Sequence, residues 1–378
     1  MNAKKYILSI GAGWQQNETI KELQQTGYKV LSIDGDKNAP GFQYSEEYEI
    51  IDIRNSDEII KFINNFDLLC AIAPNNDIGQ KICSLINQKF SLPGISLVHA
   101  KLSSNKSLWR SKLDLNNINQ PSYFYFSSYQ EFINKLKINI KSINKVVIKP
   151  NDGSGSRGVF FLNHPFKNKF LKKNIQTCIN NSYSKMCVCE EFIDGTEYSV
   201  EIFTNNYGIH KILLVSKRHM GEGASAIAIE EININNNFEM KLQKLVNTIL
   251  DIFDYKIGLT HLEIIEHDGD FFPIDIAFRG GGYWVSDKLL RRRISKNINV
   301  LLVNALLNFD TEINFSSLPN AVLVYPRNSY NSQEIKKLIN GNLNKVDHMY
   351  FDPSNKISDD SDSSRHGIEL WEKLNEKR

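Results

Sequence analysis

Residues Gly258–Trp284 read GLTHLEIIEHDGDFFPIDIAFRGGGYW, and the rest of the chain is organised around this stretch. Two runs of strand-forming residues flank His267-Asp268-Gly269-Asp270, which predicts a β-hairpin. Alternate side chains of a strand share a face. One face is predicted to carry His261, Glu263 and Ile265 from the first strand and Asp275, Ala277 and Arg279 from the second. The opposite face, predicted to be the core side, carries Leu262, Ile264, Phe272, Ile274, Ile276 and Phe278.

Two carboxylates, Glu263 and Asp275, interrupt these apolar strands. Buried carboxylates are costly without partners, so one interpretation places a cation between them. The alternative is a half-exposed hairpin with solvated charges. A two-residue Asp268-Gly269 turn would pair odd positions with even ones and put the two carboxylates on opposite faces. A shared cation site therefore predicts an odd loop or a bulge at the turn.

The composition narrows the class of protein. A length of 378 residues suggests two or three domains. A net charge of +2 gives no electrostatic case for nucleic acid. Five cysteines without a C-x-x-C pair suggest reduced thiols in a cytosolic protein. The sequence contains no run of 18 apolar residues, so we expect no membrane span and a cytoplasmic protein.

The N-terminal segment predicts a βαβ unit and hence a parallel sheet. A strand, Lys5–Ile10, enters a tight turn at Gly11 and Gly13, and a helix then leads to a second strand that closes with Asp34. This pattern raises the alternative of a nicotinamide oxidoreductase. Gln16 stands where the third glycine of that fingerprint belongs, however, and a structural role for the two glycines is the competing interpretation.

The same sheet could continue through Tyr48–Ile53, Leu68–Ala73 and Gly94-Ile95. Asn75-Asn76-Asp77 follows the end of one predicted strand, where open α/β sheets place ligand contacts. An ordinary polar loop is the alternative. This first domain is predicted to end near residue 100.

A second motif, Asn151–Gly158, reads NDGSGSRG and joins two predicted strands. It lacks Lys-Ser/Thr and a following helix, so it is not a Walker A loop. Its three glycines let backbone amides approach phosphate oxygens, and Lys149 at the end of the strand KVVIKP would point into the same space. The alternative is a simple hairpin loop.

A third motif, Glu190–Gly195, reads EEFIDG between two further strands. Such a strand–turn–strand can present a backbone edge to a purine and a carboxylate to ribose hydroxyls. Beyond the hairpin, we expect helices at Val285–Leu290 and Ile298–Phe309, a strand at Ala321–Tyr325, a helix at Gln333–Ile339 and a mobile acidic loop at Ser358–Ser364.

In chain order these motifs are a glycine-rich βα unit, Lys106, KP-x-x-GSGSRGV, EEFIDG-x-E and the E…D…R hairpin. This order resembles the ATP-grasp superfamily, specifically its carboxylate–amine ligases of the carbamoyl-phosphate-synthetase-like type, over nearly the whole chain. The resemblance implies an α/β fold, α+β in part. Its domains would be a Rossmann-like pre-grasp domain at 1–100, a linker helix and lid at 101–189, and a C-terminal mixed-sheet domain with a tail at 190–378.

The resemblance also implies an ATP site between the last two domains. Lys106 and Lys149 match the lysines that neutralise the nucleotide phosphates, and Lys149 is thereby a catalytic residue. Glu197 matches the carboxylate that binds ribose. The lid loop over the phosphates matches Ser154, Gly155, Ser156 and Gly158. The hinge that hydrogen-bonds adenine matches Glu190, Glu191, Phe192 and Ile193.

For the metal and the substrate, the resemblance implies Glu263 and Asp275 as Mg²⁺ ligands. Arg279 matches the catalytic arginine that binds the substrate carboxylate and stabilises the developing oxyanion. Backbone donors beside it are Gly280, Gly281 and Gly282.

The implied activity is a ligase that joins a small carboxylate to an amine, or to a thiol, through an acyl phosphate, with release of ADP and phosphate. One position departs from the family pattern: Ala277 stands where an asparagine usually binds metal. This leaves open an ATP-binding protein with weak or lost catalysis. Small-molecule substrates are expected, without nucleic acid or membrane partners. The substrates are not readable from the sequence, and the oligomeric state, a homodimer being one alternative, stays open.

Overall fold

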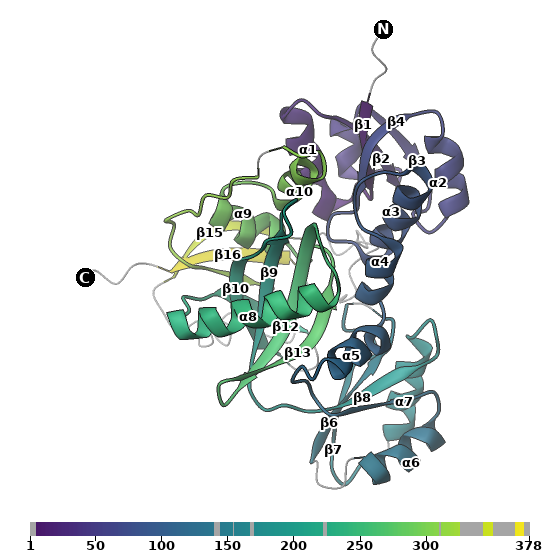
Figure 1. The fold of residues 1–378 in the computed structure, drawn as a ribbon, viewed down its shortest axis with the longest axis vertical. Helices are drawn as coiled ribbons and strands as arrows, with labels where there is room; N and C mark the ends of the chain where they lie inside the picture. The colour runs from purple at the N-terminus through teal and green to yellow at the C-terminus, as the bar shows by residue number, and fades with distance from the viewer. Residues whose placement is uncertain are drawn as a thin grey trace, which may run out of the picture.

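The computed structural model describes residues 5–139, 144–153, 155–166, 170–221, 225–309, 311–325, 343–350 and 367–373. Three sheets organise the described chain, and Figure 1 shows the N-terminal sheet at the upper right, the lid at the lower right and the large sheet to their left. The described residues include no helix long and apolar enough to cross a membrane. The domain limits at residues 100 and 189 stay predictions.

The N-terminal sheet is parallel and has the strand order β3-β2-β1-β4. Strands β1, β2 and β4 are apolar runs that helices cover on both faces, as parallel sheets require, whereas the edge strand β3 is mostly exposed. Helix α10 comes from the far end of the chain, yet it packs here through Val300, Val303 and Leu306. The elements are β1 (Lys5–Ile10), α1 (Trp14–Gln25), β2 (Lys29–Asp34), the 3₁₀-helix η1 (Pro40–Tyr44), β3 (Glu47–Ile50), α2 (Ser56–Ile63), β4 (Asp67–Ile72), α3 (Asp77–Phe90) and α10 (Ile298–Leu306).

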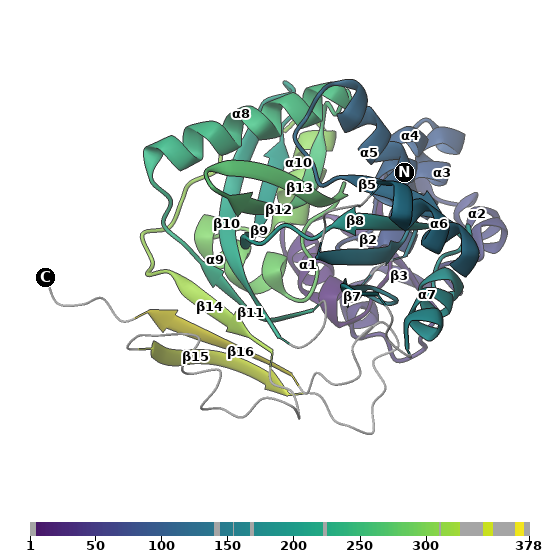
Figure 2. The same ribbon diagram turned by 90° about the horizontal axis from the view of Figure 1, so that it is seen from below.

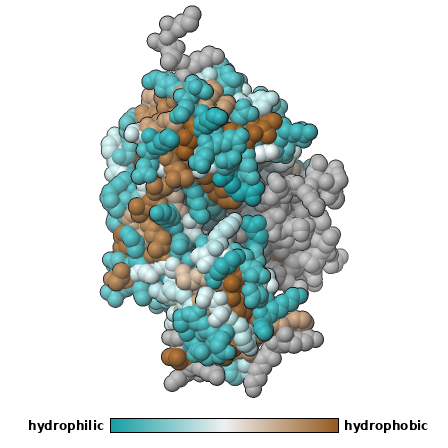
Figure 3. All heavy atoms as spheres, turned by 90° about the vertical axis from the view of Figure 1, so that its right-hand side faces the viewer, coloured by the Kyte–Doolittle hydropathy of each residue, from teal (hydrophilic) through white to brown (hydrophobic). Residues whose placement is uncertain are grey.

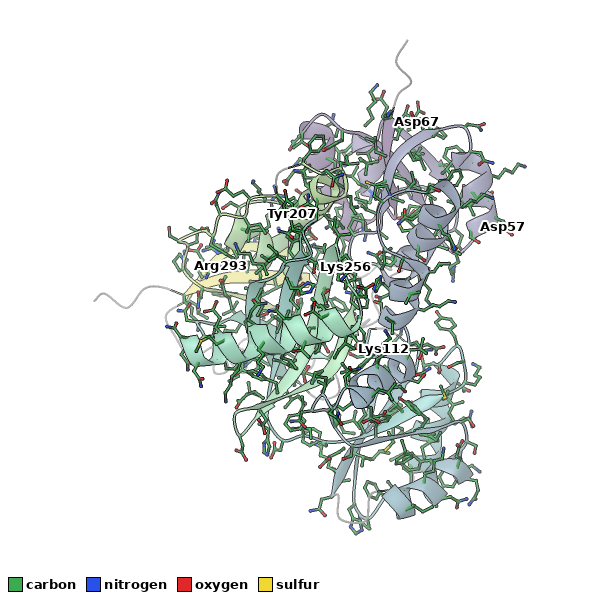
Figure 4. All side chains as sticks on the ribbon, in the orientation of Figure 1. Asp57, Asp67, Lys112, Tyr207, Lys256 and Arg293 are labelled. Carbon is green, nitrogen blue, oxygen red and sulfur yellow. The ribbon has the colours of Figure 1, made fainter. Side chains whose placement is uncertain are left out.

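Two short helices, α4 (Leu97–Ser103) and α5 (Lys106–Leu115), lead from this sheet to the lid. Ser104 is the C-cap of the first helix, and Asn105 is the N-cap of the second, because its side chain accepts a hydrogen bond from the Leu108 amide at 3.2 Å. Lys112 on α5 reaches the carboxyl end of α8 (Asn236–Ile252), where its Nζ donates to the Ile252 carbonyl at 3.4 Å (Figure 4). The last turn of α5 is thereby held against the end of α8.

The lid is an antiparallel sheet of order β5-β8-β6-β7, covered by two helices. Phenylalanines and aliphatic residues fill the space between sheet and helices, and the thiols of Cys178, Cys187 and Cys189 lie buried and free within it. These three cysteines therefore serve as packing residues of the lid core. The elements are β5 (Tyr123–Phe126), α6 (Tyr129–Asn139), β6 (Lys145–Pro150), β7 (Phe160–Asn163), α7 (Leu171–Asn180) and β8 (Cys187–Glu191).

The largest sheet has eight strands in the order β13-β12-β9-β10-β11-β14-β16-β15. One face packs against α8 through Val200, Ile202, Leu262 and Ile264. Figure 2 shows the β15–β16 pair at the far edge of this sheet, away from the lid. The remaining elements are β9 (Thr196–Thr204), β10 (His210–Met220), β11 (Ala226–Glu231), β12 (Gly258–His267), β13 (Asp270–Ala277), the π-helix η2 (Val285–Leu290), α9 (Arg291–Ile294), β14 (Ala321–Val324), β15 (Leu343–Tyr350) and β16 (Gly367–Lys373).

The hairpin β12–β13 contains the bulge that a shared carboxylate site requires. The turn itself is a two-residue turn at Asp268 and Gly269, both at positive φ, with His267 opposite Asp270. The bulge lies further along, where the register shifts between Glu263 and Ile264, and it places Glu263 directly opposite Asp275. The prediction of a bulge is confirmed, although its position at the turn is wrong.

The bulge also corrects the faces assigned to β13. Phe271, and not Phe272, packs in the core cluster against α8. Ile274 lies on the opposite side, where it lines a cavity. The extra residue shifts the alternation by one position, so face assignments from strict period two fail on the turn side of the bulge. Leu262, Ile276 and Phe278 lie in the core as predicted.

Two other predictions change. Gly94-Ile95 is not a strand but an irregular segment before α4. Val285–Leu290 is helical, as expected, but forms a π-helix. The predicted helix Gln333–Ile339 and the acidic loop Ser358–Ser364 lie outside the described residues. Figure 3 shows the face made by the N-terminal sheet and the lid, on which hydrophilic side chains predominate and apolar ones are interspersed.

Candidate functional site

A cavity of about 490 Å³ lies between the lid sheet and the open face of the large sheet. The lid and its hinge contribute one wall, and β9, β10, β12 and β13 contribute the other. The predicted site residues on its walls are Lys106, Lys149, Gly155, Ser156, Glu190, Glu191, Phe192, Ile193, Glu197, Glu263 and Asp275. Residues remote in sequence are thus gathered around one space.

Both predicted lysines point into this cavity and are held by carboxylates. Lys106 is the first residue of α5, and its Nζ lies 3.4 Å from Asp275 Oδ1. Lys149 Nζ lies 2.9 Å from Glu190 Oε2 and donates to the carbonyl of Ile274 at 3.3 Å. That carbonyl belongs to the bulge region of β13, so the irregularity that aligns the carboxylates also provides an acceptor for Lys149.

On the lid side of the cavity, Lys149 is held by a buried network of charged side chains that also contains Glu190 and Arg110. Arg110 Nη2 lies 2.7 Å from Glu190 Oε1, and the two side chains are 0% and 1% exposed. Burial raises the pKa of Glu190, but Arg110 and Lys149 outweigh it and leave the pKa below its usual value. The Glu190 side chain therefore orients Lys149 and is turned away from solvent.

The hinge lines the cavity beyond this network. Lys145 Nζ lies 3.4 Å from the ring centroid of Phe192, a cation–π contact. Backbone bonds from the Glu191 amide to Ser122 and from the Phe192 amide to Lys145 fix the strand. The segment forms a rigid, partly apolar wall of the kind that suits a flat aromatic base.

The glycine–serine loop lines the same cavity as the two lysines. Gly153, Gly155, Ser156 and Arg157 line the cavity. Gly155 has φ +65°, a left-handed conformation that favours glycine. Gly158 does not line the cavity among the described residues, and a Cβ there would meet Asn181 Cβ at 2.9 Å. Ser154 lies outside the described residues.

The opposite wall of the cavity is made of polar side chains on the adjacent strands β13, β12, β9 and β10. Glu263 faces Asp275 on β13 and Ser199 on β9. Arg218 on β10 pairs with Glu263 and lies 2.7 Å from Glu197 Oε1. Arg218 therefore holds the two carboxylates predicted to bind metal and ribose.

This arrangement moves the carboxyl pKa values in opposite directions. Burial raises the pKa of Glu263, but Arg218 and His261 outweigh it, so its pKa is well below the usual range. Burial dominates at Glu197 and raises its pKa despite Arg218. Of the two carboxyl groups that contact Arg218, that of Glu263 is therefore the more readily ionised.

Arg279 lies at the end of β13, and its guanidinium makes a two-point ion pair with Asp77. Nε lies 2.6 Å from Asp77 Oδ1 and Nη2 lies 2.9 Å from Oδ2. The amide of Gly281 donates to Glu201 Oε2 at 2.9 Å. Among the described residues, neither Arg279 nor the three glycines line the cavity. Asp77 thus occupies the place that was predicted for a substrate carboxylate.

Asn75, next to this pair, has φ +57° and both of its side-chain amide atoms are buried without a hydrogen-bond partner among the described residues. Its Oδ1 would lie 3.0 Å from a Cβ at Gly280. The loop that follows β4 therefore meets the glycine run, and its role as a ligand contact stays a prediction.

The alternative dinucleotide site is filled by the protein itself. Asp34 Oδ2 accepts the Ala12 amide at 2.8 Å. Gln16 is 5% exposed, donates to the Pro74 carbonyl at 2.8 Å, and packs against Gly11 and Gly13. These contacts favour a structural role for the two glycines.

Magnesium commonly binds one or two carboxylates together with phosphate oxygens and water. Glu263 and Asp275 are hard oxygen donors directly opposite each other on the cavity wall, and they fit that requirement. Among the described residues, no group of three His, Cys, Asp or Glu side chains is already arranged to hold a metal ion. A nucleotide would therefore have to supply part of the coordination.

Comparison with known proteins gives a consistent picture. Residues 143–287 match the model of the ATP-grasp domain family. The bifunctional purine biosynthetic protein purD of Dictyostelium discoideum is 26% identical over 272 residues, which cover 66% of this chain but only 33% of that protein. The D-alanine--D-alanine ligase of Pelagibacter ubique is 24% identical over 287 residues, covering 74% of this chain and 85% of that one. The crystal structure of an L-amino acid ligase from Bacillus licheniformis superposes with a TM-score of 0.76 at 18% identity, covering 100% and 95% of the two chains.

Three residues of the site, Arg110, Arg218 and Glu201, were not predicted from the sequence, although they hold predicted side chains in place. Asp77 was predicted in a loop that could contact a ligand, but its ion pair with Arg279 was not. The one available signal was that Arg110 lies one helical turn after Lys106. Their partners lie far away along the chain, so spacing alone could not reveal them.

Proposed function

We propose that this chain, which belongs to the ATP-grasp superfamily and has its α/β fold, is a ligase that couples a small carboxylate to an amine and releases ADP and phosphate. The observation that carries the proposal is the cavity in which Lys106, Lys149, Glu263 and Asp275 converge beneath the glycine–serine loop. Phosphoryl transfer requires positioning and charge neutralisation, and these side chains can supply both.

In the first step, a carboxylate oxygen of the acid attacks the γ-phosphorus of ATP, and the bond to the β–γ bridging oxygen breaks as ADP leaves. Lys106 and Lys149 neutralise charge on the phosphates. Their carboxylate partners keep both ammonium groups oriented before ATP arrives. Glu263 and Asp275 would hold Mg²⁺, which would offset negative charge on the phosphates.

In the second step, the amine attacks the acyl carbon, the bond to the phosphate oxygen breaks, and the amine releases a proton. Arg279 and the amides of Gly280 and Gly282 are the proposed donors to the oxyanion that forms, since the Gly281 amide already donates to Glu201. Arg279 must either share its guanidinium with Asp77 or release it, because both Asp77 oxygens are engaged with it.

The printed names of the relatives direct the choice of first substrates. One is a D-alanine--D-alanine ligase and another an L-amino acid ligase, so amino acids are the substrates to test first. The five free, buried thiols among the described residues support our placement of the reaction in the cytoplasm.

The test is to incubate the protein with Mg-ATP and pools of D- and L-amino acids and to measure ADP. We expect ADP release that requires an acid and an amine together. AMP as the product would indicate adenylation instead, and the absence of ADP across broad pools would contradict the proposal. ATP binding by calorimetry without turnover would favour the second candidate, an ATP-binding protein with lost catalysis, which Ala277 motivates.

A further inference from the structure

The buried side chain of Asn151 connects the glycine–serine loop to the start of α5. Asn151 is 0% exposed and stands between Pro150 and Gly153, which both line the cavity, but among the described residues it does not line the cavity itself. Its backbone amide donates to the Met186 carbonyl at 3.0 Å, which fixes its backbone within the lid. Its side chain contacts the first turn of α5.

Two of the first three amides of α5 have Asn151 as their acceptor. The Lys106 amide donates to the backbone carbonyl of Asn151 at 2.8 Å, and the Ser107 amide donates to Asn151 Oδ1 at 2.8 Å. The third amide, that of Leu108, donates to the side chain of Asn105. The first amides of a helix have no acceptor within the helix, so these three bonds determine where α5 begins.

The carboxamide of Asn151 is held in one orientation. Its Nδ2 donates to Asn105 Oδ1 at 3.2 Å, while its Oδ1 accepts the Ser107 amide. The Asn105 oxygen also accepts the Ser107 hydroxyl at 2.7 Å. An apolar side chain of the same size makes neither bond of Asn151, and an ionised carboxylate has no donor for Asn105.

This junction determines the position of Lys106, because Lys106 is the first residue of α5. From there its side chain crosses the cavity, where Nζ lies 3.4 Å from Asp275 Oδ1 on the opposite wall. A shift in the first turn of α5 would move the base of this side chain and change the place that the ammonium group reaches.

We propose that Asn151 is the positioning residue for Lys106: its carboxamide fixes the first turn of α5 so that the ammonium group meets the nucleotide phosphates. This inference rests on the proposed function, in which Lys106 neutralises charge on those phosphates. Asn151 acts through Lys106 and has no contact of its own with the nucleotide.

The experiment measures, by calorimetric titration, the affinity of the full chain for ADP with Mg²⁺ and for adenosine. Asn151→Leu keeps the volume of the side chain, removes its bonds to Ser107 and Asn105, and leaves the backbone bonds in place. It should weaken ADP binding about tenfold, less than the roughly 100-fold that a misplacement of about 1 Å can cost a reaction. Adenosine carries no phosphate, so its affinity should be the same in the wild type and the variant.

A double-variant cycle tests whether Asn151 acts through Lys106. Lys106→Ala removes the ammonium group, so adding Asn151→Leu to Lys106→Ala should lower the ADP affinity no further. Asn151→Asp keeps the acceptor for the Ser107 amide and should retain more ADP affinity than Asn151→Leu. If Asn151→Leu does not fold, the cycle is run with Asn151→Asp, for which we expect the same pattern with a smaller loss.

The matched control is Asn299→Leu. Asn299 is 2% exposed, and its Nδ2 donates to Thr19 Oγ1 at 3.2 Å in the contact between α10 and α1. This change also removes a buried carboxamide, so it should lower the stability of the chain, but it should leave the ADP affinity unchanged.

The outcomes are distinguishable. The positioning role is overturned, and the proposed function stands, if Asn151→Leu binds ADP as well as the control does, or loses adenosine affinity to the same extent. Losses from Lys106→Ala and Asn151→Leu that multiply in the double variant also overturn it. Failure of ADP to bind to the wild type overturns the proposed function together with this inference.

Discussion

Arg110 offers the sharpest test of how the lid is held. The change Arg110→Met removes a guanidinium that donates to Glu190 Oε1 from Nε at 2.8 Å and lies 2.7 Å from it through Nη2. It leaves Glu190, 1% exposed, with Lys149 as its one remaining cation in the network. A Met side chain has a similar apolar volume, so the change isolates the charge.

Breaking a buried ion pair by removing one partner costs about 3–5 kcal/mol, because the remaining charge stays buried. Because Lys149 still compensates the charge of Glu190, we expect Arg110→Met to lower the free energy of unfolding by the lower end of this range, about 3 kcal/mol. The double variant Arg110→Met/Glu190→Leu removes both charges. It should recover most of this loss, since replacing a whole buried pair by apolar residues is often neutral.

The assay is the free energy of unfolding from urea denaturation of the wild type, both single variants and the double variant. The control is Arg54→Met, which removes the partner of Asp52 in a pair whose side chains are 73% and 51% exposed. This control should change the free energy of unfolding by less than about 1 kcal/mol. The reasoning is refuted if Arg110→Met is as mild as the control, or if the losses of the two single variants simply add.

Three further predictions test the site and its surroundings. Lys149→Ala should lower kcat/KM roughly 100-fold or more, as expected for a lost charge-stabilising donor, whereas exposed Lys61→Ala should not; equal rates would remove Lys149 from the site. Asp77→Ala should lower kcat at least about tenfold because Arg279 loses its two-point orientation, and unchanged steady-state kinetics would make that pair merely structural. Burial raises the pKa of Asp287 from 3.8 to about 7, so its folding cost is absent below pH 3.8 and grows to about 4 kcal/mol as the pH rises past 7. Thermal unfolding of Asp287→Asn should therefore show a gain over the wild type that grows between pH 5 and 8, and a gain independent of pH would contradict the assignment.

The sequence was sufficient for the order of the elements and for much of the site. Strand periodicity and turn residues predicted the hairpin, and the requirement that Glu263 and Asp275 share a face predicted a bulge. Lys106 and Lys149, which the family resemblance matched to phosphate-neutralising lysines, line one cavity, and their roles there stay predictions.

Period two could not locate the bulge, so Phe272 and Ile274 were assigned to the wrong face. Spacing also could not predict contacts between distant segments. Arg279 and Asp77 are separated by 202 positions, and Arg110 and Glu190 by 80. Such pairs depend on how three separate sheets dock, which local patterns do not encode.

The central claim is that a carboxylate is activated as an acyl phosphate on this chain. Its most direct test supplies an acid labelled with ¹⁸O in the carboxylate, together with an amine and unlabelled ATP, and follows the released phosphate by ³¹P NMR. We predict that one ¹⁸O atom moves from the acid to inorganic phosphate for each bond formed. Product formation with unlabelled phosphate, or with the label in AMP, would contradict this account.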